Sequence, residues 1–279
     1  MSTRIATARA TTRGAPTVGS ARGVRSEEPV TGEADRSLAG ASAGDADPLA
    51  VAQRPKIRLD MHTHTEFSPD SRTPLARFAD AARAAGLGAV CVTDHNTVDG
   101  ALRLREMAAG FRVVVGEEIY SGDGEIIGLF LESAVPPHLP AAETMDRIHA
   151  QGGLVYIPHP FSRNRLRHMK LEQLSALVGH IDAVEVFNAR EMSKTSNAKA
   201  LAFALSHTKP GGVGSDSHRV SELGRAYVEI ADFTTPAELL EALRQGTVTG
   251  RISGMAMHVR TWGDAAAKAA GRAAKRLRL

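Results

Sequence analysis

Two histidines stand two positions apart in the segment LDMHTHTEFSPD, residues 59–70, and an acid follows the second by six residues. Side chains at positions i and i+2 of a strand point to the same face, so His62 and His64 could bind one metal ion. A lone His-x-His pair also arises by chance in chains without a metal. The pair therefore indicates a metal site only if other segments supply further ligands.

Four later segments supply such ligands, each at the end of an apolar run typical of a buried strand. They are Thr93-Asp94-His95, Gly116-Glu117-Glu118, Pro158-His159-Pro160 and Ser215-Asp216-Ser217-His218. In α/β barrels and open parallel sheets, the carboxyl ends of the strands meet at one face, where active sites lie. We therefore predict one metal centre at that face, with the candidate ligands His62, His64, Asp70, His95, Glu118, His159, Asp216 and His218.

This set of ligands exceeds what one four-coordinate ion can use, so we predict two or three divalent ions that share a bridging carboxylate. Imidazoles and carboxylates without a thiolate favour Mn, Fe or Zn. The one cysteine, Cys91, lies in an apolar run and is expected to be a buried structural thiol. Clustered divalent ions generate hydroxide near neutral pH and neutralise phosphoryl oxygens, so hydrolysis of a phosphate ester suits this centre best.

The elements that must position these residues alternate along the chain. β-branched runs predict strands, and amphipathic segments between most of them predict helices. The strands are expected at 57–62, 89–93, 112–119, 125–131, 154–158, 183–187, 212–215 and 226–230, and the helices at 73–85, 98–109, 140–151, 171–178, 193–206 and 235–245. This alternation predicts an α/β fold with a largely parallel sheet, either a barrel or a doubly wound sheet, interrupted by one hairpin at 112–131.

Two helix starts are marked by Thr-Pro pairs. Thr73-Pro74 and Thr235-Pro236 each offer a hydroxyl at the N-cap followed by proline at the first helical position. Glu238 would complete a capping box with Thr235.

The two ends of the chain differ in composition from its centre. Residues 1–54 contain none of the aromatic residues and are rich in small and polar types, so we predict a disordered segment, with a transit peptide as the alternative. We expect a catalytic domain at 55–254 and a basic tail at 255–279. The net charge of +3 comes from the basic ends, which could contact nucleic acid weakly. No apolar run is long enough to span a membrane, and we expect a cytoplasmic protein.

The ordered motifs resemble the PHP superfamily (polymerase and histidinol phosphatase) of metal-dependent phosphoesterases, over about residues 57–250. This resemblance implies an α/β fold of the distorted (β/α)7 TIM-like barrel type with three metal ions. It also implies the grouping of ligands. His62, His64 and Asp216 would hold one ion, Asp70, His95 and His218 a second, and Glu118 would bridge toward a third ion shared with His159.

One position departs from that pattern. Related phosphoesterases usually place a further histidine on the strand after the Glu118 motif, where this chain has Glu125. Glu125 could ligate the third ion as a carboxylate, or it could point to solvent and leave a site for two ions. Asp94 is adjacent to His95 but out of phase, so we expect it to orient a ligand or to cap a helix. Glu117 is likewise out of phase with Glu118 and is left out of the site.

Recognition of phosphate requires cations other than the metals. Arginine guanidinium groups bind phosphate in a bidentate fashion, and several follow the predicted strands on the catalytic side. The candidate substrate contacts are Arg163, Arg165, Asn188 and Arg190, with Asn188 also a candidate for orienting a ligand.

Our lead hypothesis is a metal-dependent phosphoric ester hydrolase in which a metal-bridging hydroxide attacks phosphorus. The substrate would be a nucleotide, a phosphorylated small metabolite or a short oligonucleotide, and the few aromatic residues favour a small molecule. The main alternative is a nucleic-acid-binding or regulatory module whose metal site is structural and whose basic tails make the contact. An amidohydrolase is less well supported, because such sites usually include a metal-bridging lysine and no lysine here ends a core strand.

Overall fold

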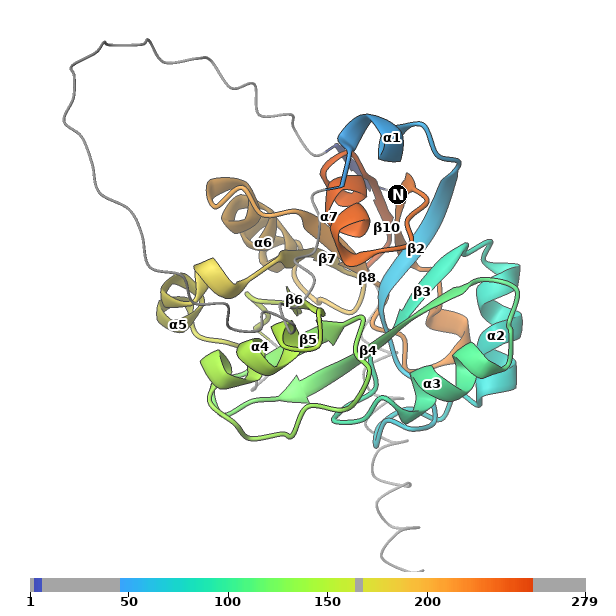
Figure 1. Cartoon of the computed structure of the whole chain (residues 1–279), viewed down its shortest axis with the longest axis horizontal. Helices are drawn as coiled ribbons and strands as arrows, with labels where there is room; N and C mark the ends of the chain where they lie inside the picture. The colour runs from blue at the N-terminus through green and yellow to red at the C-terminus, as the bar shows by residue number, and fades with distance from the viewer. Residues whose placement is uncertain (1–2, 7–45, 164–167, 253–279) are drawn as a thin grey trace, which may run out of the picture.

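The computed structural model describes residues 3–6, 46–163 and 168–252 (Figure 1). Most of the predicted elements are found, with ends that differ by a few residues. The strands are β1 (Thr3–Ala6), β2 (Lys56–Thr63), β3 (Ala89–Val92), β4 (Arg112–Tyr120), β5 (Glu125–Leu129), β6 (Leu154–Ile157), β7 (Ala183–Asn188), β8 (Gly211–Gly214), β9 (Ala226–Ala231) and β10 (Thr247–Gly250). The helices are α1 (Pro48–Ala52), α2 (Leu75–Ala84), α3 (Asp99–Glu106), α4 (Ala141–His149), α5 (Leu171–Ala176), α6 (Lys194–Ser206) and α7 (Pro236–Arg244), with short 3₁₀ turns at Val178–His180 and Val220–Glu222.

Strands β2 to β8 follow one another around a nearly closed barrel, in the order of the sequence. The ring closes where β8 meets β2. Thr63 forms a parallel bridge with Ser217, and the backbone N–H of His64 donates to the Ser217 carbonyl at 2.9 Å. The prediction of a distorted α/β barrel is therefore confirmed.

The predicted hairpin is also confirmed. Strands β4 and β5 pair in antiparallel fashion from Gly116–Leu129 to Tyr120–Glu125, and β5 pairs antiparallel with β6. The other neighbours within the ring are parallel. This insertion places Glu125 at the same end of the barrel as the carboxyl-terminal part of β4.

Among the described residues, three strands lie outside the ring, and only β9 was predicted from the sequence. Strand β9 pairs antiparallel with β2, and β10 and β1 extend the sheet from there. The strand β10 was missed because the short run 247–250 has only one buried apolar side chain, Val248, and gains its structure by pairing with β9.

Within the segment expected to be disordered, the described residues 46–54 contain helix α1. Asp47 caps α1 by accepting from the Leu49 N–H at 3.0 Å, Val51 is buried, and Arg54 forms an ion pair with Glu238 on α7 at 2.5 Å. Tertiary contact with α7 gives this short segment the stability that its composition lacks. Residues 1–2 and 7–45, like the tail at 253–279, lie outside the described residues.

The two Thr-Pro pairs behave differently. Thr235 caps α7 as expected, because its hydroxyl accepts from the Glu238 N–H at 3.3 Å and Glu238 completes the capping box. The cap expected at Thr73 is wrong, since α2 begins after Pro74 without a side-chain cap. The Thr73 hydroxyl donates instead to the carbonyl of His218 at 3.2 Å, next to the candidate site.

Helices cover the outer face of the barrel, with α2 and α3 beside β3 and β4 and with α6 near β7 (Figure 1). Strands β3, β5, β6, β7 and β8 are buried along their whole length, because side chains fill the barrel on one side and helices or loops lie on the other. Within the described ranges, none of the helices has the length and apolar composition needed to cross a bilayer.

Candidate metal centre

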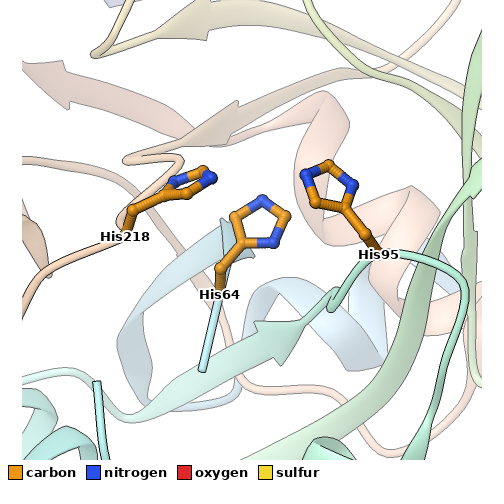
Figure 2. A group of neighbouring side chains, drawn as sticks. All are labelled: His64, His95 and His218. Atoms are coloured by element: carbon orange, nitrogen blue, oxygen red, sulfur yellow. The ribbon is translucent and has the colours of Figure 1, made fainter. Parts of the chain in front are cut away.

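The metal ligands expected from the sequence all lie at one end of the barrel. The parallel strands finish there, and Glu125 lies there at the start of the antiparallel strand β5. Figure 2 shows three of these ligands, His64 from the end of β2, His95 after β3 and His218 after β8, with their imidazole rings facing one another. The ring centroids of His64 and His218 are 4.3 Å apart, and those of His64 and His95 are 4.6 Å apart. Residues more than 150 positions apart in the chain thus share one cluster, as the strand-end argument predicted.

Glu118 occupies the centre of this cluster. Its Oε2 lies 3.2 Å from His62 Nε2, 3.3 Å from His64 Nε2 and 3.2 Å from His95 Nδ1. Its other oxygen, Oε1, lies 3.0 Å from His159 Nε2. One fully buried carboxylate therefore touches four imidazoles through two oxygens, which is the geometry that a bridging ligand needs.

The candidate ligand atoms fall into overlapping groups in which every pair of atoms is within 4.8 Å. These groups are His62, His64 and Asp216; His64, His95 and His218; Glu118, Glu125 and His159; and His62, His159 and Glu185. Asp70 adjoins the second group, since its Oδ2 is 2.9 Å from His218 Nε2 and 3.6 Å from His95 Nε2. The residues of each ion set that the family resemblance implies are thus found side by side.

Hydrogen bonds on the far side of two rings hold His64 and His218 with Nε2 toward the centre. His218 Nδ1 lies 2.9 Å from the carbonyl oxygen of Asp216, which can only accept, so Nδ1 carries a proton and Nε2, 2.9 Å from Asp70 Oδ2, is the nitrogen that would bind an ion. His64 Nδ1 lies 2.9 Å from Ser68 Oγ, whose own proton goes to Asp94 Oδ1 at 2.8 Å. His64 is therefore also protonated on Nδ1 and free to bind a metal through Nε2.

Asp94 supports the first strand of the site. Besides Ser68, it accepts from the backbone N–H of Thr65 at 2.7 Å and from the Thr65 hydroxyl at 2.6 Å. These contacts hold the loop that follows His64. Asp94 therefore orients a candidate ligand through Ser68, and the alternative of a helix cap has no support in its contacts.

Two candidate ligands have a left-handed backbone, which is uncommon for residues other than glycine. The φ angle is 29° at His159 and 52° at Asp216. Each conformation is held by a short hydrogen bond from its own N–H, to Glu185 Oε2 at 2.7 Å for His159 and to the His62 carbonyl at 2.7 Å for Asp216. Such conformations concentrate at functional sites, where the surrounding contacts offset the free energy of the backbone strain.

The histidines keep the carboxylates ionised. Burial acts to raise the pKa of Glu118, but His62 and His95 outweigh it and hold this pKa well below its usual value. For Asp70, burial likewise acts upward, and His218 and His95 lower the pKa well below its usual value. These carboxylates are thus anions, the form in which they bind metal.

Glu125 faces the site and does not point to solvent. It is 6% exposed, and its Oε2 lies 3.7 Å from His159 Nε2. Of the two alternatives for this residue, the position of its side chain agrees with a ligand.

The four expected substrate contacts differ in their exposure and in their neighbours. Arg163 is exposed and lines a surface hollow that begins at Pro160, directly after His159. Arg165 lies outside the described residues. Arg190 is buried, with its Nη1 3.5 Å from Glu222 Oε2. The amide nitrogen of Asn188 donates to Glu185 at 3.0 Å and to Asp216 at 3.1 Å, so Asn188 orients a candidate ligand, the second of its two expected roles.

Three buried acids that support the site were missed from the sequence. Glu185 lies within β7, Glu222 accepts from the His218 N–H at 2.7 Å, and Asp60 accepts from the Ser215 N–H at 2.9 Å. Burial raises the pKa of Asp60 to about 7. The available signal was a charged residue between apolar neighbours in a strand, which holds for Glu185 and Asp60 but not for Glu222.

The residues present fit divalent ions. Several buried oxygen and nitrogen atoms have no hydrogen-bond partner within the part of the chain that the structure describes, among them Asp70 Oδ1, Glu125 Oε2 and His159 Nδ1. Buried polar atoms are normally paired, so a cluster of unpaired atoms suggests a bound group that is neither a side chain nor the backbone. Nitrogen and carboxylate oxygen donors suit Zn, Mn or Fe.

The fold and the site together define an α/β barrel protein with a cluster of candidate metal ligands at the carboxyl ends of its strands. A family model described as the PHP domain matches residues 60–213, and a model described as PHP-associated matches residues 194–248. The chain therefore belongs to the PHP family, as the motifs predicted.

Relatives in sequence and structure agree with this membership. The uncharacterised protein MJ0417 of Methanocaldococcus jannaschii is 34% identical over 202 residues, which are 67% of this chain and 79% of the relative. A two-domain protein of Bacteroides vulgatus, described as containing a "predicted PHP-like metal-dependent phosphoesterase", matches with a TM-score of 0.58 and 18% identity over 76% of this chain and 68% of its own. PsfC from Pseudomonas syringae matches with a TM-score of 0.57 and 18% identity over 76% of this chain and 98% of its own. At this identity the structural matches show the fold alone.

Proposed function

We propose that this protein hydrolyses a phosphate ester with the help of two or three divalent metal ions. The observation that supports this most is the position of Glu118, whose two oxygens contact His62, His64, His95 and His159. When bound, such ions acidify water and neutralise the charge that develops on the phosphoryl oxygens.

The residues of the chain would divide this work among them. His62, His64 and Asp216 form one ligand set, and Asp70, His95 and His218 form a second. Glu118 would join these sets to a third, made with Glu125 and His159. Ser68 and the Asp216 carbonyl fix the ring orientation of His64 and His218, which keeps the ligands in place without rearrangement.

The proposed substrate is a phosphorylated small molecule, with a short oligonucleotide as the alternative. The hollow that begins at Pro160 has a volume of about 570 Å³, within the range of small-molecule sites, and Arg163 and Lys199 line it together with Phe161. Two cations at such a hollow suit an anionic substrate. The basic ends that could contact nucleic acid lie outside the described residues.

The test is metal removal followed by a panel of phosphate monoesters and diesters. Dialysis against a chelator should abolish hydrolysis, and Mn²⁺, Fe²⁺ or Zn²⁺ should restore it. His62→Ala and Asp216→Asn should each lower kcat/KM on the order of 100-fold or more, because each removes a ligand. His149→Ala is a matched control, since this exposed histidine pairs with Asp182 far from the cluster and its loss should leave hydrolysis unchanged.

Other outcomes distinguish the alternatives. Full activity in both ligand variants would show that the site is assigned incorrectly. A metal-bound protein without hydrolysis of any ester would favour the regulatory module with a structural metal site.

A further inference from the structure

Glu185 is an ionisable residue at the centre of an otherwise apolar strand, and its side chain is aimed at the metal centre. We infer that Glu185 is a positioning residue, which holds the ring of His62 in the orientation needed for metal binding and ties it to the backbone of His159. This inference rests on the proposed metal site, and it does not depend on which reaction the site performs.

The contacts of Glu185 account for both of its carboxylate oxygens. Oε1 lies 3.1 Å from His62 Nδ1. Oε2 accepts from the His159 N–H at 2.7 Å and from the Asn188 side-chain amide at 3.0 Å. Because a carboxylate can only accept, the contact with Glu185 places a proton on Nδ1 of His62. Its Nε2, 3.2 Å from Glu118 and 3.1 Å from His64 Nε2, is the nitrogen that would bind an ion.

The same carboxylate connects two parts of the centre. His62 belongs to the set with His64 and Asp216, whereas His159 belongs to the set with Glu118 and Glu125. Asn188, held by Glu185, also donates to Asp216 Oδ2 at 3.1 Å. Movement of Glu185 would therefore disturb ligands on one strand and two loops at once.

A glycine on the neighbouring strand makes room for this arrangement. A Cβ atom at Gly214 would lie 2.2 Å from Glu185 Oε1 and 2.4 Å from His62 Cβ, distances that no packed side chain allows. The barrel therefore brings Glu185 and His62 into contact only because position 214 of β8 has no side chain.

The competing explanation is that Glu185 binds metal directly, because its oxygen, a nitrogen of His62 and a nitrogen of His159 lie within 4.8 Å of one another. Three protein donors already use its two oxygens. The hydrogen bonds therefore favour support over ligation.

The decisive variant is Glu185→Gln, which keeps the size of the side chain but replaces one acceptor with an NH₂ donor. One of the N–H groups of His62 and His159 must then face another donor. We expect the affinity for Zn²⁺ or Mn²⁺, measured by competition with a chelator, to fall about 10-fold to 100-fold. The number of ions bound per chain at saturating metal should stay as in the wild type.

Glu117→Gln is the matched control, because Glu117 is equally buried but accepts from the Val135 N–H at 2.7 Å on the other side of the barrel wall. This variant should keep the metal affinity of the wild type. Gly214→Ala should weaken metal binding as Glu185→Gln does. The double variant should be little weaker than either single one, because both changes break the same contact.

Two results with the Glu185→Gln variant would overturn the inference. An unchanged metal affinity in Glu185→Gln would show that Glu185 does not support the site, and the loss of one ion per chain at saturating metal would show that it is a ligand.

The wild-type protein loaded with Zn²⁺ gives a test that needs no variant to fold. Its imidazole ¹⁵N spectra should show His62 protonated at Nδ1 and bound through Nε2, and binding through Nδ1 would contradict the inference. A protein that binds metal in this way but hydrolyses nothing would refute the proposed function alone.

Discussion

Glu117 and Glu118 are neighbours on β4, both fully buried, yet they lie on opposite faces of the barrel wall. Glu118 faces inward to four imidazoles, and its pKa is held well below the usual value. Glu117 faces outward, where burial raises its pKa to about 7 and a backbone N–H from Val135 opposes this only in part. The same residue type on the same strand is thus an anion on one face and partly protonated near neutral pH on the other.

This difference shows how the two faces are built. The inner face at the carboxyl ends of the strands collects imidazoles and carboxylates. Ser68 and Glu185 support them by accepting hydrogen bonds, and Asn188 by donating one. The layer between the strands and helices is mainly apolar, so a carboxylate there has few partners. The inner face is suited to bind cations, whereas the outer layer stabilises the fold.

The largest effect is expected from Glu118→Gln, which removes the charge at the centre of the inner face. The variant keeps the shape of the side chain but loses the anion that contacts four histidines. We expect hydrolysis of the best substrate in the panel to fall on the order of 100-fold to 1000-fold. Metal content per chain, measured by elemental analysis, should fall as well. Unchanged metal content would contradict the bridging role of Glu118.

A smaller and pH-dependent effect is expected from Glu117→Gln. The folded protein keeps the Glu117 proton up to about pH 7, whereas the unfolded chain releases it near the usual pKa of 4.5. Between these values the folded state binds more protons, so this residue makes the wild type less stable as the pH rises through that window, with no further loss above it.

Glu117→Gln removes this penalty. Its stability relative to the wild type should therefore rise between about pH 4.5 and 7, by roughly 3 kcal/mol at most. Urea unfolding at several pH values measures the difference. A difference that does not change with pH would show that Glu117 is not buried as an acid in the folded protein.

The smallest effect is expected from Thr235→Ala in the outer layer. The substitution removes the N-cap of α7 and should cost about 1 kcal/mol of unfolding free energy. Metal affinity and hydrolysis should be unchanged, because the contacts of this cap lie within the first turn of α7. A loss of metal affinity in this variant would mean that the two faces are coupled more closely than their contacts indicate.

Much of the fold and the site could be predicted because both follow from local rules. The apolar runs gave the strands of the ring, and the rule that strand ends meet at one face brought together His62, Glu118 and His218 before their distances were known. Local rules failed where a partner lay elsewhere. The hydroxyl of Thr73, next to a proline, was expected to cap α2 but bonds to the His218 carbonyl, 145 residues away in the chain.

The sequence by itself determined the α/β class and the candidate ligands, because residue type, spacing and strand ends are local properties, and the motifs they form pointed to the family and through it to a barrel. Only the tertiary structure decided what supports those ligands. Glu185 is 123 residues from His62, and nothing in the run Ala183–Asn188 indicates which strand lies opposite it. The barrel closes with β8 between β7 and β2, and Gly214 leaves the space in which Glu185 and His62 meet. Such a contact depends on the packing of three strands together, which no single segment encodes.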